Sequence, residues 1–247
     1  MRAALTFHGV DATGSVLSVS PAELAGLVRA IQGSGHAIVP LHQLVAEPAS
    51  PKRVALTFDD GFRSVHDEAL PVLREVGVVA TLFLTTGFVG ADNGWPGQPA
   101  WAPRFPMMGW GEVEALHAAG WSIESHGARH LDLCLLDDEA IESELLEAEE
   151  TLVRRLGQRP EAFAYPYGAH DARVRERVGK RHRWAWTTEL AALGHGTRGS
   201  PAGDDALALP RLDAYYLRSP WVHRRFGSLP FEVYVRGRRW LRGLRSR

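Results

Sequence analysis

The sequence has almost no cysteine, because Cys134 is the only one among 247 residues. A disulfide within the chain is therefore excluded, and so is a metal site built from several thiolates. Such a low cysteine content suits a reducing compartment. Any metal site in this protein has to be built from carboxylates and from the 11 histidines of the chain.

Long apolar runs and an excess of charge of one sign are also missing. No stretch approaches the about 20 apolar residues that a membrane-spanning helix needs. The few apolar residues before His8 are too short for the core of a signal peptide. The formal net charge is −1, so the chain as a whole does not attract nucleic acid. We expect a cytoplasmic protein without a nucleic-acid partner.

Short β-rich runs alternate with helical patterns along the chain. Hydrophobic residues make up 45% and charged residues 23%, the composition of an ordinary folded protein. Predicted strands cover residues 3–7, 36–39, 53–58, 79–85, 121–124, 162–164, 184–187 and 209–212. Predicted helices cover residues 21–32, 64–76, 110–119, 138–156, 172–178 and 230–244. This alternation predicts an α/β fold of βα units around a mainly parallel sheet, closed into a barrel in a single domain.

Two adjacent carboxylates, Asp59 and Asp60, end the strand predicted at residues 53–58 and are followed by Gly61. Like charges so close together raise each other's pKa, and a bound cation would resolve that conflict. Asp-Asp-Gly is also an ordinary turn sequence. The strand before it favours a functional strand end, because active sites of βα barrels lie at that face.

Two histidines, His126 and His130, follow the strand predicted at residues 121–124. A spacing of four brings both imidazoles to one side of a helical turn or a tight loop, and Gly127 favours the loop. A pair at this spacing also arises by chance in a chain with 11 histidines. Together with Asp60, however, the pair supplies a ligand set that suits Zn²⁺ or another first-row divalent ion.

An aromatic turn, Tyr165-Pro166-Tyr167-Gly168, follows the strand predicted at residues 162–164. Proline presets such a turn, so the motif is explained by backbone geometry alone. Alternatively, its aromatic rings form the wall of a sugar-binding groove, and the Tyr167 backbone N–H points at the reacting oxygen. Two glycine-rich segments, residues 90–108 and 193–207, are predicted to be long loops at the rim of the barrel.

The three motifs, in this order and separation, resemble those of the polysaccharide deacetylases, the NodB-homology or carbohydrate esterase family 4 group. The resemblance implies a distorted (β/α)7-type barrel and one divalent metal. It assigns Asp59 as the catalytic base and Asp60, His126 and His130 as the metal ligands. It also implies hydrolysis of an N-acetyl group on a sugar, with the oxyanion held by the metal and the Tyr167 backbone N–H.

The chain departs from the family pattern in two places. The arginine that usually stands two residues before the proline and orients the base is replaced by Ala164, which leaves Thr57 and Arg129 as candidates for that role. The family's last motif, Leu-x-His, matches residues 193–195 and makes His195 a candidate acid for the departing amine. His8, at the end of the first predicted strand, is a candidate residue lining the substrate site.

Two other functions remain open at this point. The core motifs recognise the acyl centre, so a related metal hydrolase acting on a non-sugar amide is one alternative. The missing arginine suggests a catalytically silent carbohydrate-binding protein as the other, although the intact Asp59 argues against it. A polysaccharide, a lipid-linked sugar and a nucleotide-linked sugar are all candidate substrates.

The carboxyl-terminal stretch from Arg236 to Arg247 contains six arginines interleaved with Trp240, Leu241 and Leu244. We expect the barrel to occupy residues 1–228 and residues 229–247 to form a basic helix or tail. A solvated tail is one interpretation of this pattern. The other is peripheral contact with anionic lipid at the inner face of a membrane, which would suit a lipid-linked substrate.

Overall fold

Parallel strands close into a barrel in the computed structural model, which describes residues 1–47, 52–98, 102–194 and 205–245. Within these ranges the barrel has seven strands: β1 (Arg2–Phe7), β5 (Arg53–Phe58), β6 (Thr81–Leu84), β7 (Ser122–Ser125), β8 (Ala162–Ala164), β9 (Trp184–Leu190) and β10 (Leu209–Asp213). Pairing of β1 with both β10 and β5 closes the barrel. The short strand β4 (Ala37–Ile38) pairs with the start of β5, and β2 (Gly9–Val10) pairs with β3 (Ser18–Val19) in a separate sheet.

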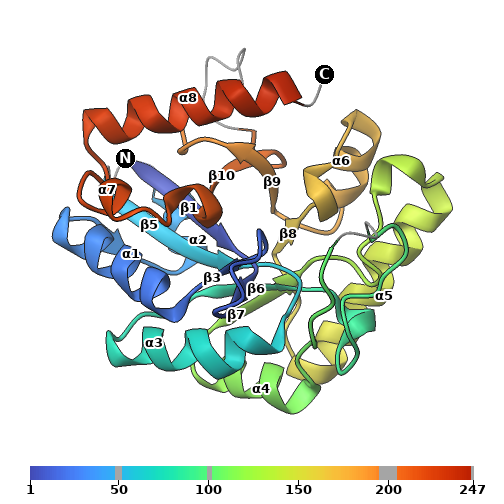
Figure 1. Cartoon of the computed structure of the whole chain (residues 1–247). Coiled ribbons are helices and arrows are strands. Elements are labelled where there is room, and N and C mark those ends of the chain that lie inside the picture. The colour runs from blue at the N-terminus through green and yellow to red at the C-terminus, as the bar shows by residue number, and fades with distance from the viewer. Residues whose placement is uncertain (48–51, 99–101, 195–204, 246–247) are drawn as a thin grey trace.

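Helices surround the barrel (Figure 1). They are α1 (Pro21–Gly33), α2 (Leu41–Ala46), α3 (Leu70–Glu75), α4 (Trp110–Ala118), α5 (Asp138–Leu156), α6 (Ala172–Gly179), α7 (Pro220–His223) and α8 (Leu229–Arg245). The predicted (β/α)7-type barrel is confirmed, and each predicted strand overlaps an observed one. The sequence patterns did not predict α2, α7 or the β2–β3 pair, which are too short to show a periodicity. None of the helices in the described ranges is long and apolar enough to cross a membrane.

The residues of the strands alternate between the helices and the barrel interior. Leu5, Val54 and Leu56 face outward and pack with α1 in the main core. Small side chains such as Ala4 and Ala55 point inward, where they leave room for Phe83 and Trp186. The barrel is therefore filled by side chains, and its polar groups gather at the carboxyl ends of the strands.

A buried histidine, His182, makes the stability of this fold depend on pH. The ring lies against Phe163, with 5.3 Å between ring centroids, and burial lowers the pKa of His182 to about 4. An unfolded histidine titrates at about 6.5. The contribution of His182 is therefore present above pH 6.5 and is lost as the pH falls towards 4, by about 3 kcal/mol in total.

When the pH falls from 7 to 4, we predict that the free energy of unfolding of His182→Gln decreases by about 3 kcal/mol less than that of the wild type. Urea unfolding at a series of pH values measures this difference. The matched control is His42→Gln, because His42 is exposed. Parallel pH curves for the wild type and His182→Gln would show that His182 is not the residue responsible.

Candidate metal centre and active site

Asp59 and Asp60 lie at the carboxyl end of β5, and both side chains are buried. Gly61 follows with φ of 104°, and a Cβ atom there would stand 2.6 Å from Leu84 Cδ1. The chain can therefore turn sharply behind the two acids only if this residue is glycine. The turn directs the two adjacent carboxylates to different partners.

Asp60 faces the two histidines. Its Oδ1 lies 3.3 Å from Nε2 of His126 and 3.3 Å from Nε2 of His130. Nδ1 of His126 lies 2.7 Å from the Ala164 carbonyl oxygen, to which it donates, so Nε2 is the nitrogen that faces Asp60. His126 and His130 come from the loop after β7, as the glycine at 127 predicted.

These three side chains fit a divalent metal. Ligand atoms about 2.0–2.1 Å from a tetrahedral zinc ion stand about 3.4 Å apart, close to the spacing found around Asp60 Oδ1. This oxygen is buried and has no hydrogen-bond donor among the described residues. A buried acceptor without a donor is costly, and a cation would compensate it.

The protonation states of these residues also suit a cation. Burial raises the pKa of Asp60, but the two histidines that face it outweigh this effect and hold the pKa well below its ordinary value. Burial lowers the pKa of His130 and so favours the neutral imidazole, the form that binds metals. For His126, burial lowers the pKa, but Asp60 and Asp59 outweigh burial and raise it. A proton therefore competes for His126 at acidic pH.

Backbone strain is concentrated at this site. Within the described ranges, the non-glycine residues with positive φ are Asp60 (72°), His130 (57°) and Tyr167 (58°). Each such conformation costs about 1–3 kcal/mol and persists only where the surrounding structure enforces it. The strained residues are two candidate ligands and the predicted oxyanion donor, which supports a functional role for this end of the barrel.

Asp59 is held by a buried arginine, Arg211, from β10. Nη1 of Arg211 donates to Asp59 Oδ1 and Nη2 donates to Oδ2, both at 2.7 Å. Nε of Arg211 donates to the Thr187 carbonyl oxygen at 3.1 Å, and Nη1 also donates to Thr57 Oγ1 at 3.2 Å. Burial raises the pKa of Asp59, but the charge and hydrogen bonds of Arg211 outweigh it and lower the pKa. Asp59 is therefore ionised at neutral pH, as a general base must be.

The sequence pattern of the polysaccharide deacetylases matches residues 46–182, more than half of the chain. The chain belongs to the polysaccharide deacetylase family. This family consists of hydrolases that act on carbon–nitrogen bonds other than peptide bonds. The predicted family resemblance is thus confirmed.

Relatives match this chain in sequence or, for a solved structure, in fold. The Bacillus subtilis protein YxkH is 23% identical over 194 residues, which are 76% of this chain and 64% of YxkH. A chitin deacetylase of Pestalotiopsis sp is 31% identical over 141 residues, 57% of this chain and 43% of that enzyme. The crystal structure of a polysaccharide deacetylase from Bacillus cereus covers 86% of this chain with a TM-score of 0.70 at 24% identity, and 64% of that protein is matched. The chain thus spans less than two thirds of the length of these relatives.

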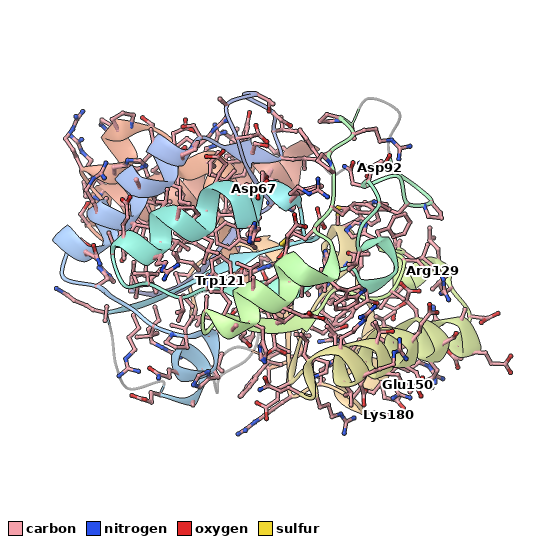
Figure 2. The ribbon with its side chains drawn as sticks, turned by 90° about the horizontal axis from the view of Figure 1, so that it is seen from below. Asp67, Asp92, Trp121, Arg129, Glu150 and Lys180 are labelled. Atoms are coloured by element: carbon pink, nitrogen blue, oxygen red, sulfur yellow. The ribbon has the colours of Figure 1, made fainter. Side chains whose placement is uncertain are left out.

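Arg211 orients Asp59, the role for which the sequence left Thr57 and Arg129 as candidates. The prediction of Arg129 is wrong, since its Nη1 donates to Glu144 Oε2 at 2.7 Å and its Nη2 donates to Glu147. Figure 2 shows Arg129 beside α5, which carries both glutamates. Thr57 supports the base only indirectly, because its hydroxyl accepts from Arg211 and donates to the Leu5 carbonyl oxygen at 2.9 Å.

Glu144 is a further residue of the site that sequence reasoning missed. Its buried carboxylate accepts hydrogen bonds from the backbone N–H and from the guanidinium of Arg129. Gly127 lies directly against the same carboxylate, since a Cβ atom there would be 3.0 Å from Glu144 Oε1. The loop between His126 and His130 is therefore fixed to α5, which helps to orient both imidazoles.

The aromatic turn supplies one exposed ring rather than two. The prediction that Tyr165 and Pro166 line the substrate site is wrong, because both are buried and the Tyr165 hydroxyl donates to the Leu207 carbonyl oxygen at 2.8 Å. Tyr167 is 44% exposed, and its ring lies edge-on to His130, with 4.6 Å between centroids. The buried Trp95 also stacks on His130, with 4.2 Å between ring centroids. The predicted loop at residues 90–108 thus contributes a residue to the metal centre.

The two remaining candidates have different outcomes. His8, at the end of β1, is half-buried and close enough to Asp59 and Asp60 for its charge to lower the pKa of both. It therefore lies at the site, and its contact with substrate stays a prediction. His195, the candidate acid, lies outside the described residues.

Arg211 is open to a direct test as the residue that positions Asp59. We expect Arg211→Lys to lower kcat about 10- to 100-fold, because lysine keeps the charge and loses the paired hydrogen bonds. Arg211→Met leaves Asp59 buried without a cation. It should therefore move the acidic limb of the kcat/KM profile to higher pH.

These effects are measured by pre-steady-state and steady-state rates as a function of pH. The unfolding temperature of each variant checks that it is folded. Arg104→Lys is the matched control, since Arg104 pairs with Asp92 at 3.2 Å on the surface. Full activity and an unshifted acidic limb in Arg211→Met would show that Arg211 is structural only.

Proposed function

We propose that this protein is a metal-dependent hydrolase that removes an N-acetyl group from a sugar. One observation carries the proposal. Asp59 and Asp60 are adjacent in sequence, yet one is clamped by Arg211 and the other faces His126 and His130. This division provides an ionised base directly beside a candidate metal site, the arrangement that hydrolysis of an acyl group requires.

The chemistry divides between a metal and the side chains of the chain. When bound by Asp60, His126 and His130, a divalent ion would polarise the acyl carbonyl and lower the pKa of water. Asp59 removes the proton from the attacking water, and Arg211 keeps the carboxylate oriented towards it.

Further residues complete the proposed reaction. The backbone N–H of Tyr167 is proposed to donate to the developing oxyanion, and the position of the Tyr167 ring against His130 supports this role. The acid that protonates the departing amine is proposed to be His195. Zinc is the proposed ion, because two imidazoles and one carboxylate are ligands that zinc accepts with positions left open for water and substrate.

The substrate class is proposed from the relatives and from the site. A chitin deacetylase is among the relatives, which supports an N-acetylated amino sugar as the substrate. The exposed ring of Tyr167 next to His130 offers an apolar surface on which a sugar ring can stack. The sugar is proposed to be part of a polysaccharide or linked to a lipid or nucleotide. A cytoplasmic location also stays a proposal, supported by the single cysteine.

The test is acetate release from a panel of N-acetyl compounds by the wild type with added Zn²⁺. The panel contains chitin oligomers, free N-acetylglucosamine, a nucleotide-linked N-acetyl sugar and a non-sugar acetamide. We expect release from at least one sugar and much less from the acetamide. Preference for the acetamide would favour the amide hydrolase instead, and binding of chitin oligomers without any release would favour a silent carbohydrate-binding protein.

A further inference from the structure

Helix α8 has an apolar face on the side opposite to the one that packs on the barrel. Phe231 and Val235 are buried in the main core. The exposed apolar residues of the helix are Leu229, Val233, Trp240, Leu241 and Leu244. Their spacing places them along one side of the helix, and we call this set the outer stripe. Trp240 is 66% exposed, although tryptophan is among the residues that lose most by contact with water.

An exposed arginine, Arg236, borders the outer stripe, and the helix as a whole is basic. The helix carries five arginines and one glutamate, in a chain whose net charge is −1. Arg236 is exposed next to the stripe, while Arg239 is held by Glu189. Positive charge is therefore concentrated on this helix, whereas the rest of the chain is acidic.

Helix α7 extends this face. The ring of Trp221, which is 40% exposed, lies 5.8 Å from the ring of Tyr234 on α8. The Arg225 guanidinium stands 4.6 Å above Trp221. A second aromatic ring and a second, half-buried cation thus lie at the edge of the outer stripe.

We propose that the outer stripe of α8, with Trp221 of α7 and Arg225 just after α7, docks on the surface of a membrane that contains anionic lipids. A helix that combines an apolar side, basic flanks and tryptophan lies in the plane of a membrane interface. Tryptophan prefers the headgroup level, and long arginine side chains reach lipid phosphates while their stems stay in apolar contact. Figure 1 shows α8 at the top of the molecule, where it is the outermost element among the described residues.

Charge favours lipid over a second copy of the chain as the occupant. Two copies packed through this face would bring their arginines together, and like charges across an interface cost several kcal/mol. Arg238 stands over Tyr216 and Arg239 is held by Glu189, so the cations that would approach the second copy are Arg236 and Arg225, against Glu232 as the one acid on α8. An anionic lipid surface complements both the apolar residues and the charge.

The experiment is co-sedimentation of the full chain with vesicles of phosphatidylcholine alone or mixed with phosphatidylserine. This measurement needs no acetyl substrate, so its outcome is independent of the deacetylase proposal. The first variant is Trp240→Ser/Leu244→Ser, and its matched control is Leu135→Ser/Val153→Ser, at exposed apolar residues outside α8. The second is Arg225→Gln/Arg236→Gln. Its control is Arg154→Gln/Arg155→Gln, where Arg155 stands over Trp110 as Arg225 stands over Trp221.

We expect the wild type to bind the mixed vesicles and not the neutral ones. Each arginine near an anionic surface contributes about fivefold to partitioning, so Arg225→Gln/Arg236→Gln should lower it about 25-fold. Trp240→Ser/Leu244→Ser should lower it at least about tenfold, and both controls should bind like the wild type. Unfolding temperatures check that the variants are folded. No binding of the wild type to mixed vesicles, or a dimer in sedimentation equilibrium that Trp240→Ser/Leu244→Ser dissociates, would overturn the proposal.

Discussion

His130→Asn is expected to abolish metal binding and to lower kcat/KM by at least about 10³-fold, because a divalent ion supplies several kcal/mol of transition-state stabilisation. Asparagine is the appropriate replacement, since it tolerates the φ of 57° that His130 adopts and so separates loss of the ligand from backbone strain. Metal content by mass spectrometry and acetate release measure the two effects together. Both should fall in parallel.

Two comparisons make this result specific to the metal centre. His42→Asn removes an exposed histidine that belongs to no candidate metal group among the described residues, and it should change neither quantity. Excess Zn²⁺ should restore part of the activity of His130→Asn, since Asp60 and His126 remain. If His130→Asn keeps its metal and its rate, the role assigned to His130 is wrong.

Asp59→Asn is expected to keep the metal and to lower kcat about 10²- to 10⁴-fold, because a general base contributes a rate acceleration of this size. Asparagine has nearly the same shape and leaves Asp60 in place. The combination of retained metal and lost rate distinguishes the base from the ligands, whose variants lose both. Metal content and kcat of the same purified sample test this.

The fold of Asp59→Asn has to be checked, because the change leaves Arg211 charged, buried and without its partner. A broken buried pair costs about 3–5 kcal/mol, so a lower unfolding temperature is expected. In Asp59→Asn/Arg211→Gln the buried charge is gone, and this variant should recover most of that stability while staying inactive. An active double variant would contradict the assignment of Asp59.

The parts of the site that the sequence could predict are those at strand ends. The strand before Asp59 is mainly apolar, and the glycines at 61 and 127 mark turns that need positive φ. Because the carboxyl ends of parallel strands meet at one face of a barrel, motifs at residues 59–60 and 126–130 had to lie close together. The fold followed from the same alternation of strands and helices.

Arg211 and Glu144 escaped prediction because their partners are distant in the sequence. Arg211 lies 152 residues from Asp59, and only the closure of the barrel through β1 and β10 brings them together. A signal was present in both cases, since Arg211 interrupts an apolar strand and Glu144 lies on the apolar face of α5 beside Leu145. A charged residue in a buried pattern needs a partner.

Tyr165 was assigned to the substrate site because a motif does not show which of its residues are exposed. Its side chain continues the outward-facing side of β8 and joins the cluster of Phe163 and Val174. The ring of Tyr167 is not buried in this way. The backbone of Tyr167 adopts a left-handed conformation, with φ of 58°, which directs the ring to the surface. Local backbone geometry decides this difference, and it depends on tertiary contacts.

Anomalous diffraction from crystals grown with Zn²⁺ tests the central claim most directly. A single peak is expected about 2.0–2.2 Å from Asp60, His126 Nε2 and His130 Nε2, and it should disappear in crystals of Asp60→Asn. Asp59 should stay outside the ligand sphere with both oxygens on Arg211. A peak that lies elsewhere, or that persists in Asp60→Asn, would contradict the assignment of this site.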